Sequence, residues 1–437
     1  MNPATATLAT PSGTHWPRGA GWRYGLLGLP LAFCALPLYV FMPHFYATEW
    51  GVSLAAMGSL LLVLRVFDAA LDPLMGRWCD HLVARSVHHL LRVMAVSAVA
   101  LALAFAALFH PQVAASQALP WAAGTLVLTY LAYSLLTVAH QSWGARLGGD
   151  AVHRSRVVAW REGLGLLGVV AASVVPSVWG VDTLSTLMAL TLLAGGWALA
   201  WAPRPVPPAL TPVDDTAAAA SANSLLQPWR NPAFLRLLAV FALNGIATAV
   251  PATLVLFFIE DRLQAPATMQ GLFLGLYFVC GALSMPLWLR AVRRWGLAQG
   301  WLLGMCLSVL AFAGAATVGA GDVLTYAVVC ALSGLALGSD LALPAALLAG
   351  VTRHEPSASG VHFGWWNLVA KLNLALAAGL ALPLLDWLGY APGVRDADSL
   401  RALTAVYCLL PCALKLLAAA ALYGFFIHRQ ERTSHAT

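Results

Sequence analysis

Charge is scarce in this chain. Only 10% of its 437 residues are charged, whereas 60% are hydrophobic. The mean hydropathy of +0.77 is higher than a soluble globular domain can present to water. These values exclude an ordinary soluble enzyme and indicate an integral membrane protein.

Several chemical signatures are also missing. No G-x-x-x-x-G-K-[ST] motif occurs, so the sequence does not support an ATP-driven pump. H-x-x-x-H, H-E-x-x-H and G-x-S-x-G are absent too, which argues against a membrane enzyme. The seven cysteines are an odd, scattered set and are interpreted as small buried hydrophobes. We therefore expect no enzyme activity and no cofactor apart from a coupling ion.

Long apolar runs recur along the whole chain. A helix of about 20 residues crosses a hydrocarbon core of about 30 Å, and continuous runs without strict alternation exclude a β-barrel. The sequence predicts an all-α membrane protein with about twelve transmembrane helices. Their predicted first residues are Tyr24, Ser53, His89, Pro120, Val157, Thr183, Ala233, Thr268, Gln299, Leu324, Gly360 and Ala402.

The Pro/Ala/Ser-rich stretch 204–231 divides the predicted helices into two sets of six. We expect an N-terminal bundle at 24–203, a cytoplasmic linker at 204–231 and a C-terminal bundle at 232–427. Two bundles joined in this way are typical of secondary transporters, whose substrate site lies between the halves near the bilayer midplane.

The polar segment 1–23 lacks the apolar core of a signal peptide, so we expect it, like residues 428–437, to be a cytoplasmic tail. Arginines gather at alternate helix ends, and by the positive-inside rule this pattern places both termini in the cytoplasm. The net charge of +6 therefore indicates membrane topology and not nucleic-acid binding.

A charge at the centre of a membrane helix costs at least about 2.5–3.5 kcal/mol on insertion scales, so each one needs an explanation. The predicted helices contain eight such residues: Arg65, Asp68, Asp72, Arg161, Glu162, Asp340, Lys371 and Lys415.

Asp68 and Asp72 are four residues apart and share one helix face. Two carboxylates placed in this way need a cation between them, which can be Na⁺, Li⁺, a proton or a fixed basic side chain. Lys371, one of only two lysines, is the expected partner. The alternative is a static ion cluster with Arg65 that only sets helix packing. Asp80 is expected to cap or latch a neighbouring helix N-terminus.

Four stretches carry a family resemblance: "RVFDAALDPLMGRWCD", "YGLLGLPLAF", "RVVAWREGLGLLG" and "WWNLVAKLNLALAAG". Together they resemble the glycoside/pentoside/hexuronide:cation symporters, the melibiose permease group of the major facilitator superfamily. The resemblance implies the fold of that superfamily. It also implies a cation site at Asp68 and Asp72 with Lys371 beside it, and makes Arg161 and Trp143 the matching substrate-site residues.

The sequence departs from that pattern where sugar-transporting members carry first- and fourth-helix acids. Ala32 stands in the first of these places, and "TVAHQSWGARL" has no acid in the second. Carboxylates orient sugar hydroxyls through paired hydrogen bonds, so their loss makes an ordinary galactoside less favoured. We expect the cavity to be lined by neutral polar, aromatic and basic side chains, with packing as the alternative role of each: Arg161, Trp143, His140, Gln141, Asn244, Trp365, Trp366 and Asn367.

The function predicted from these features is cation-coupled symport of a small solute by alternating access, with a sugar or glycoside implied by the family resemblance. One alternative is a carrier of an amphiphile such as a lysophospholipid, in which Arg161 meets a phosphate. Another is a non-transporting sensor or scaffold that keeps the fold. The coupling ion stays open between Na⁺, Li⁺ and H⁺. The expected partners are a small solute and the lipid bilayer, with no nucleic acid, for a monomer in a bacterial inner membrane.

Overall fold

A computed structural model describes residues 17, 19–205, 225–355, 358–390, 393 and 395–428. The predicted tails lie mostly outside these ranges, as does linker segment 206–224, but residues 20–23, predicted as tail, are helical. Within the described ranges the chain is helical and contains no strand.

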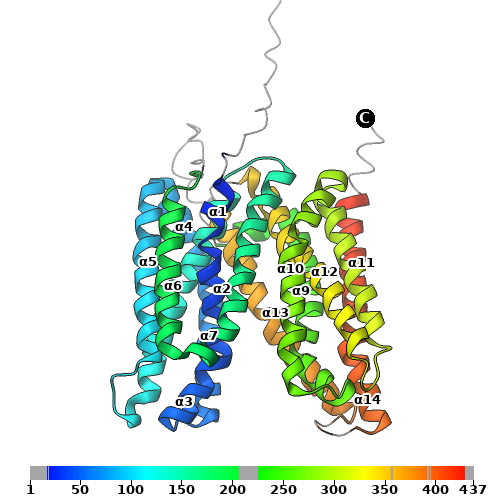
Figure 1. Cartoon of the computed structure of the whole chain (residues 1–437). Helices are drawn as coiled ribbons and strands as arrows, with labels where there is room; N and C mark the ends of the chain where they lie inside the picture. The colour runs from blue at the N-terminus through cyan, green and yellow to red at the C-terminus, as the bar shows by residue number, and fades with distance from the viewer. Residues whose placement is uncertain are drawn as a thin grey trace, which may run out of the picture.

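The N-terminal half forms one bundle (Figure 1). Its first span is interrupted and consists of α1 (Ala20–Gly25), α2 (Gly28–Leu36), the π-helical η1 (Pro37–Phe41) and α3 (Met42–Trp50). The next spans are α4 (Leu54–Arg85), α5 (Val87–Phe109) and α6 (Ala118–Ala145), with the short η2 (Ala115–Gln117) before α6. The long α7 (Ala151–Ala200) supplies two spans, because Gly180 breaks it with a φ of 77° that glycine adopts readily.

The C-terminal half forms the second bundle. After η3 (Gln227–Arg230) come α9 (Pro232–Phe257) with η4 (Phe258–Arg262), α10 (Ala267–Trp295), α11 (Leu297–Ala315) and α12 (Val323–Val351). After η5 (Thr352–His354) and α13 (Ser359–Trp387), the last span is α14 (Ala397–Thr404), η7 (Ala405–Leu409), α15 (Leu410–Leu422) and η8 (Tyr423–Ile427).

These elements make twelve spans, and each begins within about six residues of its predicted start. In the described part of the chain, nine helices are long and apolar enough to cross a membrane. The span α4, which carries Asp68 and Asp72, is not among the nine. The all-α membrane architecture with two six-helix bundles is confirmed.

Polar residues at the helix starts take up free backbone N–H groups. Ser53 accepts from Ala56 N (3.2 Å), Asp150 from His153 N (2.7 Å), and Asn231 from Ala233 N and Phe234 N (3.0 and 3.2 Å). Such caps satisfy backbone donors that have no partner inside the helix. They explain why these spans start where they do.

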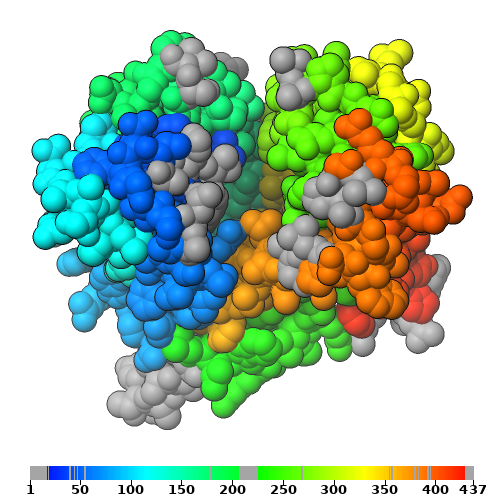
Figure 2. Space-filling model, turned by 90° about the horizontal axis from the view of Figure 1, so that it is seen from below, coloured from blue at the N-terminus to red at the C-terminus, as the bar shows by residue number. Residues whose placement is uncertain are grey.

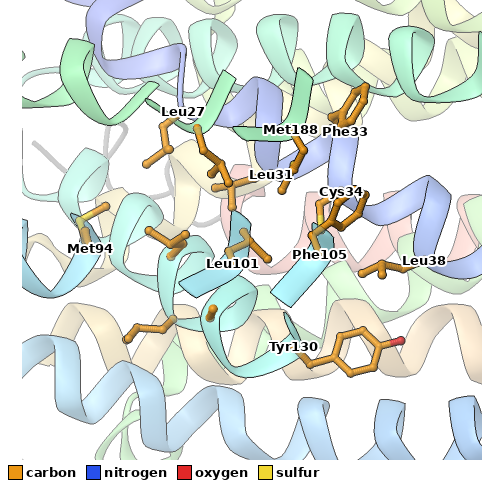
Figure 3. Close-up of a cluster of buried hydrophobic side chains, with 14 of the residues drawn as sticks. Leu27, Leu31, Phe33, Cys34, Leu38, Met94, Leu101, Phe105, Tyr130 and Met188 are labelled. Atoms are coloured by element: carbon orange, nitrogen blue, oxygen red, sulfur yellow. The ribbon is translucent and has the colours of Figure 1, made fainter. Parts of the chain in front are cut away.

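The first bundle has an apolar interior. Figure 3 shows part of it, where Leu31 and Phe33 of α2 lie near Leu101 and Phe105 of α5, with Met188 of α7 close by. Large apolar side chains also point outward, such as Leu283 and Leu310, which are 73% and 70% exposed. An outer surface of this kind suits contact with lipid.

The two bundles touch at the end of the molecule where α1 lies, and they diverge at the other end, where α3 and α14 lie (Figure 1). Their main contacts are made by α4 and α6 against α13, and by α7 against α10 and α12. Gly76 and Gly360 allow the closest approach, because a Cβ on either would overlap the carbonyl oxygen of the other. Seen from the diverging end, a hollow separates the blue and cyan half from the green and orange half (Figure 2).

Candidate functional site

The two aspartates of α4 face Lys371 of α13, on the opposite bundle. The Lys371 Nζ atom lies 2.6 Å from Asp68 Oδ2 and 2.8 Å from Asp72 Oδ2, and it donates to Asp72 Oδ1 at 3.0 Å. The aspartates are 2% and 1% exposed. The predicted contact of Lys371 with the aspartate pair is confirmed, and this contact joins the bundles.

Ser134 of α6 completes this cluster. Its hydroxyl donates to Asp68 Oδ1, and its Oγ accepts from Lys371 Nζ at 3.0 Å. The ammonium group is thus surrounded by oxygen atoms from three side chains, the kind of ligand that hard cations prefer. We call Asp68, Asp72, Ser134 and Lys371 the cross-bundle cluster.

A cavity of about 250 Å³ borders the cross-bundle cluster. Its lining combines α4, α6 and α13 and mixes polar side chains with apolar surface. The lining residues are Arg65, Asp72, Tyr133, Ser134, Thr137, Gln141, Asn367, Ala370, Lys371 and Leu374. Of the eight residues predicted to line the cavity, Gln141 and Asn367 do so, and Asp72 and Lys371 of the predicted cation site line it as well.

Besides the Thr137 hydroxyl, two buried amide atoms of the cavity lining have no hydrogen-bond partner among the described residues: Gln141 Oε1 and Asn367 Nδ2. A buried polar group without a partner costs about 1–3 kcal/mol, so a ligand that supplies the missing partners gains from them. One is an acceptor and the other a donor, which matches a hydroxyl group.

Arg161 lies next to the cavity and not in it. Its guanidinium pairs with the neighbouring Glu162, with Nε donating to Oε1 at 2.9 Å. It lines a separate pocket of about 10 Å³ at the bundle interface, which Gln141 and Arg154 also line. That volume holds about one water molecule.

His140 and Trp143 lie inside the first bundle. The His140 ring packs 4.4 Å from the ring of Tyr24, and its Nε2 lies 2.8 Å from the Tyr24 carbonyl oxygen. Trp143 is fully buried and donates from Nε1 to Pro203 O at 2.9 Å. The structure does not bring either residue to the cavity, because both lie on another face of α6 from Ser134, Thr137 and Gln141.

Asn244 and Trp366 lie inside the second bundle. Trp366 stacks on Phe241 with ring centroids 3.6 Å apart. Asn244 accepts a hydrogen bond from Lys415 Nζ at 2.9 Å, and the same ammonium lies 2.6 Å from Asp340 Oδ2. Neither Asn244 nor Trp366 lines the described 250 Å³ cavity. Trp365 does not line it either, and its Nε1 donates to Leu225 O at 2.9 Å.

Asp80 links the bundles at their closed end. Its carboxylate accepts from the backbone N atoms of Gly360 (2.7 Å) and Val361 (3.0 Å) and pairs with Arg146. These N–H groups begin α13, so the expected cap on a neighbouring helix is confirmed.

Sequence reasoning missed Ser134 and Thr137. A serine or threonine within a membrane helix commonly bonds its own helix backbone, so nothing in the sequence marks these two as site residues. Their spacing from Gln141 places them on one helix face, but only the structure shows that this face meets α4 and α13. No group of three or more His, Cys, Asp or Glu that could hold a metal occurs among the described residues.

Comparison with known proteins agrees with this architecture. The family described as MFS/sugar transport protein matches residues 23–429. A putative sulfoquinovose importer of Salmonella typhimurium is 25% identical over 433 residues, covering 93% of this chain and 89% of that protein. A putative glycoside/cation symporter of Escherichia coli, YagG, is 29% identical over 152 residues, about a third of each protein (34% and 33%).

Among solved structures, a bacterial homologue of the iron transporter ferroportin in an outward-facing state superposes with a TM-score of 0.66. It covers 92% of this chain and 98% of that one at 16% identity, so the likeness concerns the fold.

Proposed function

Because this chain belongs to the MFS/sugar transport protein family, and is therefore a multi-pass membrane transporter and not an enzyme, we propose that it is a cation-coupled symporter. Its cargo is a small polyhydroxylated solute, a sugar or a glycoside. The bundles alternate access to a site between them.

The observation that carries this proposal is the cross-bundle cluster. Asp68 and Asp72 belong to one bundle and Lys371 to the other, so rocking of the bundles changes the distances between them. When the ammonium withdraws, two buried carboxylates need another cation, because uncompensated buried charge is costly. Na⁺, Li⁺ or a proton can take that place, and its arrival is thereby coupled to the movement of the bundles.

The state described here has the termini-bearing end closed by Asp80 and the Gly76–Gly360 contact. With both termini in the cytoplasm, this is an outward-open state, which receives the solute from outside a bacterial inner membrane while Lys371 still occupies the place of the ion. Ion binding that stabilises one arrangement of the bundles shifts the population toward it.

The chemistry of the cavity supports a solute rich in hydroxyl groups. Gln141, Thr137 and Asn367 offer neutral donors and acceptors. The volume of about 250 Å³ is close to the lower end of small-molecule sites, about 300–1,000 Å³. The names of the two relatives, a putative glycoside/cation symporter and a putative sulfoquinovose importer, support the same class.

Thermal unfolding of the purified protein in NaCl, LiCl or choline chloride at constant ionic strength, and across pH, tests the ion site. A ligand that binds the folded state stabilises it by mass action. We expect Na⁺, Li⁺ or a proton to raise the melting temperature of wild type. The same ion should raise the melting temperature of Glu49→Gln, a control at an exposed residue, and should leave that of Asp72→Asn unchanged.

Uptake of radiolabelled glycosides into proteoliposomes under that ion gradient tests coupling. Accumulation that requires the gradient supports symport. No response to any ion or to pH would contradict cation coupling. Ion binding without uptake of any sugar, glycoside or lysophospholipid would favour the sensor alternative.

A further inference from the structure

A second buried ion pair lies wholly inside the C-terminal bundle. Lys415 Nζ is 2.6 Å from Asp340 Oδ2, and the other carboxylate oxygen accepts from Trp301 Nε1 at 2.9 Å. Lys415 also donates to Asn244 Oδ1 at 2.9 Å, and the Thr248 hydroxyl lies 3.4 Å from Asp340 Oδ2. We call these five residues the inner cluster.

The inner cluster is distinct from the cross-bundle cluster but lies at a similar depth. None of its five residues lines the described 250 Å³ cavity. Lys415 precedes the end of η8 at Ile427 by 12 residues, and Lys371 follows the start of α13 at Ser359 by 12. At 1.5 Å per residue, both ammonium-bearing residues lie about 18 Å from the closed end.

The Asp340 carboxylate has its donors inside its own bundle. It accepts from the Trp301 indole N–H and from the Lys415 ammonium. Because both donors belong to the same bundle as Asp340, we treat the inner cluster as a fixed ion pair.

Stability does not explain why the pair is there. Replacing a buried ion pair by apolar residues of similar volume is often neutral or stabilising, so packing alone could be achieved without charge. An ion pair with hydrogen bonds constrains the geometry of its neighbours. The ammonium fixes the orientation of the Asn244 amide and with it the position of α9.

A short path leads from Asn244 to Lys371. The next residue on α9, Gly245, packs directly against the side-chain amide of Asn373, which a Cβ at position 245 would overlap. Asn373 lies on α13 two residues after Lys371 and is itself 4% exposed. The packing of α9 against α13 at this point fixes the position of Lys371 relative to Asp68 and Asp72.

We propose that Asp340 and Lys415 are positioning residues for the coupling ion: they hold α9 through Asn244, and α9 holds α13 so that Lys371 reaches Asp68 and Asp72. The inference rests on the proposed function, because it assigns the inner cluster the task of setting ion affinity at the cross-bundle cluster.

The test uses a charge-neutral double variant, Asp340→Asn/Lys415→Met, which keeps an acceptor for Trp301. The matched control is Tyr326→Phe/Tyr407→Phe, which removes a buried hydroxyl pair (2.8 Å) that joins the same two spans nearer their other ends. Two readouts are compared. The first is the NaCl or LiCl concentration that gives half-maximal thermal stabilisation, or the corresponding pH midpoint if the ion is a proton. The second is the NMR signal of ¹³Cε-labelled lysine. With only two lysines in the chain, the double variant leaves Lys371 alone in the spectrum.

We expect the double variant to fold with a melting temperature close to that of wild type. Its ion affinity should fall on the order of tenfold or more, as outer-shell changes do at metal sites. Its Lys371 signal in the NMR spectrum should shift. The control should change neither readout. An unchanged midpoint together with an unchanged Lys371 signal overturns the inference while leaving the symporter proposal intact. If wild type responds to no ion, the symporter proposal fails, and an unshifted Lys371 signal then rejects the positioning role independently.

Discussion

The two lysines of this chain form a natural comparison. Both lie near the middle of their spans and both pair with aspartate, but Lys371 reaches across to the other bundle, whereas Lys415 pairs within its own. Lys371 borders the cavity and its side chain is 16% exposed, while that of Lys415 is 3% exposed. A rigid-body movement of the bundles changes the first pair and leaves the second intact.

This difference separates two uses of buried charge. An ion pair between moving bodies can be exchanged for a solute ion, because its geometry depends on the conformational state. An ion pair within one body cannot be exchanged in this way and can only fix the body's internal geometry. The first bundle also has ion pairs of its own, Asp80 with Arg146 and Arg161 with Glu162, but neither involves a lysine.

The comparison predicts the largest loss of stability when Lys415 alone is removed. Lys415→Met leaves the Asp340 carboxylate buried without its ammonium, and breaking one partner of a buried pair costs about 3–5 kcal/mol. Chemical unfolding in detergent should show this loss, with little recovery in NaCl or LiCl because the pair does not border the cavity. Strong rescue by an alkali cation would contradict the distinction between the two pairs.

Lys371→Met should destabilise the protein less. Asp68 and Asp72 would face each other without the ammonium, but an ion or a proton can enter from the cavity, so we expect a loss of about 1–3 kcal/mol. Added coupling ion or acidic pH should restore most of it, and gradient-driven uptake should be abolished. A loss that no ion and no pH restores would place Lys371 with Lys415 as a fixed structural charge.

Asp80 extends the comparison to the closed end. Asp80→Asn weakens charge-assisted hydrogen bonds to the start of α13, worth about 1.5–3 kcal/mol, and should favour opening between the bundles. Thiol labelling of the adjacent, buried Cys79 should become faster. The control is Asp261→Asn, which loses bonds to Tyr390 and Gly393 within one bundle and should leave Cys79 labelling unchanged.

Much of this architecture follows from local sequence features. Apolar length predicts the spans, the four-residue spacing places Asp68 and Asp72 on one face, and the scarcity of lysine identifies Lys371 as their partner. These predictions depend on the period of one helix or on the cost of a lone charge in lipid. The structure confirms both the spans and the contact.

The rest depends on which face of a helix meets its neighbours. By residue type, His140 and Trp143 are as suitable for a substrate site as Gln141. Of the three, Gln141 faces the cavity, because the face of α6 that carries Gln141 is turned toward α4 and α13. Asp340 and Lys415 are evident as intramembrane charges of the C-terminal bundle, but their pairing requires knowing that α12 and α15 converge near α9 and α11. Sequence periodicity carries no such information.

The smallest predicted effect isolates the part of the cross-bundle cluster that sequence could not reveal. Ser134→Ala removes a hydroxyl that donates to Asp68 and accepts from Lys371, a net loss of about 0.5–1.5 kcal/mol. We expect the ion midpoint in thermal unfolding to rise several-fold, because Ser134 is also an oxygen ligand available to an incoming cation. Ser333→Ala is the matched control, since the Ser333 hydroxyl bonds its own helix, at Val329 O (2.7 Å) and Cys330 O (3.2 Å), and no other part of the described chain. If both variants lower stability equally and neither changes the ion midpoint, Ser134 only supports packing, and the ion site is formed by the carboxylates alone.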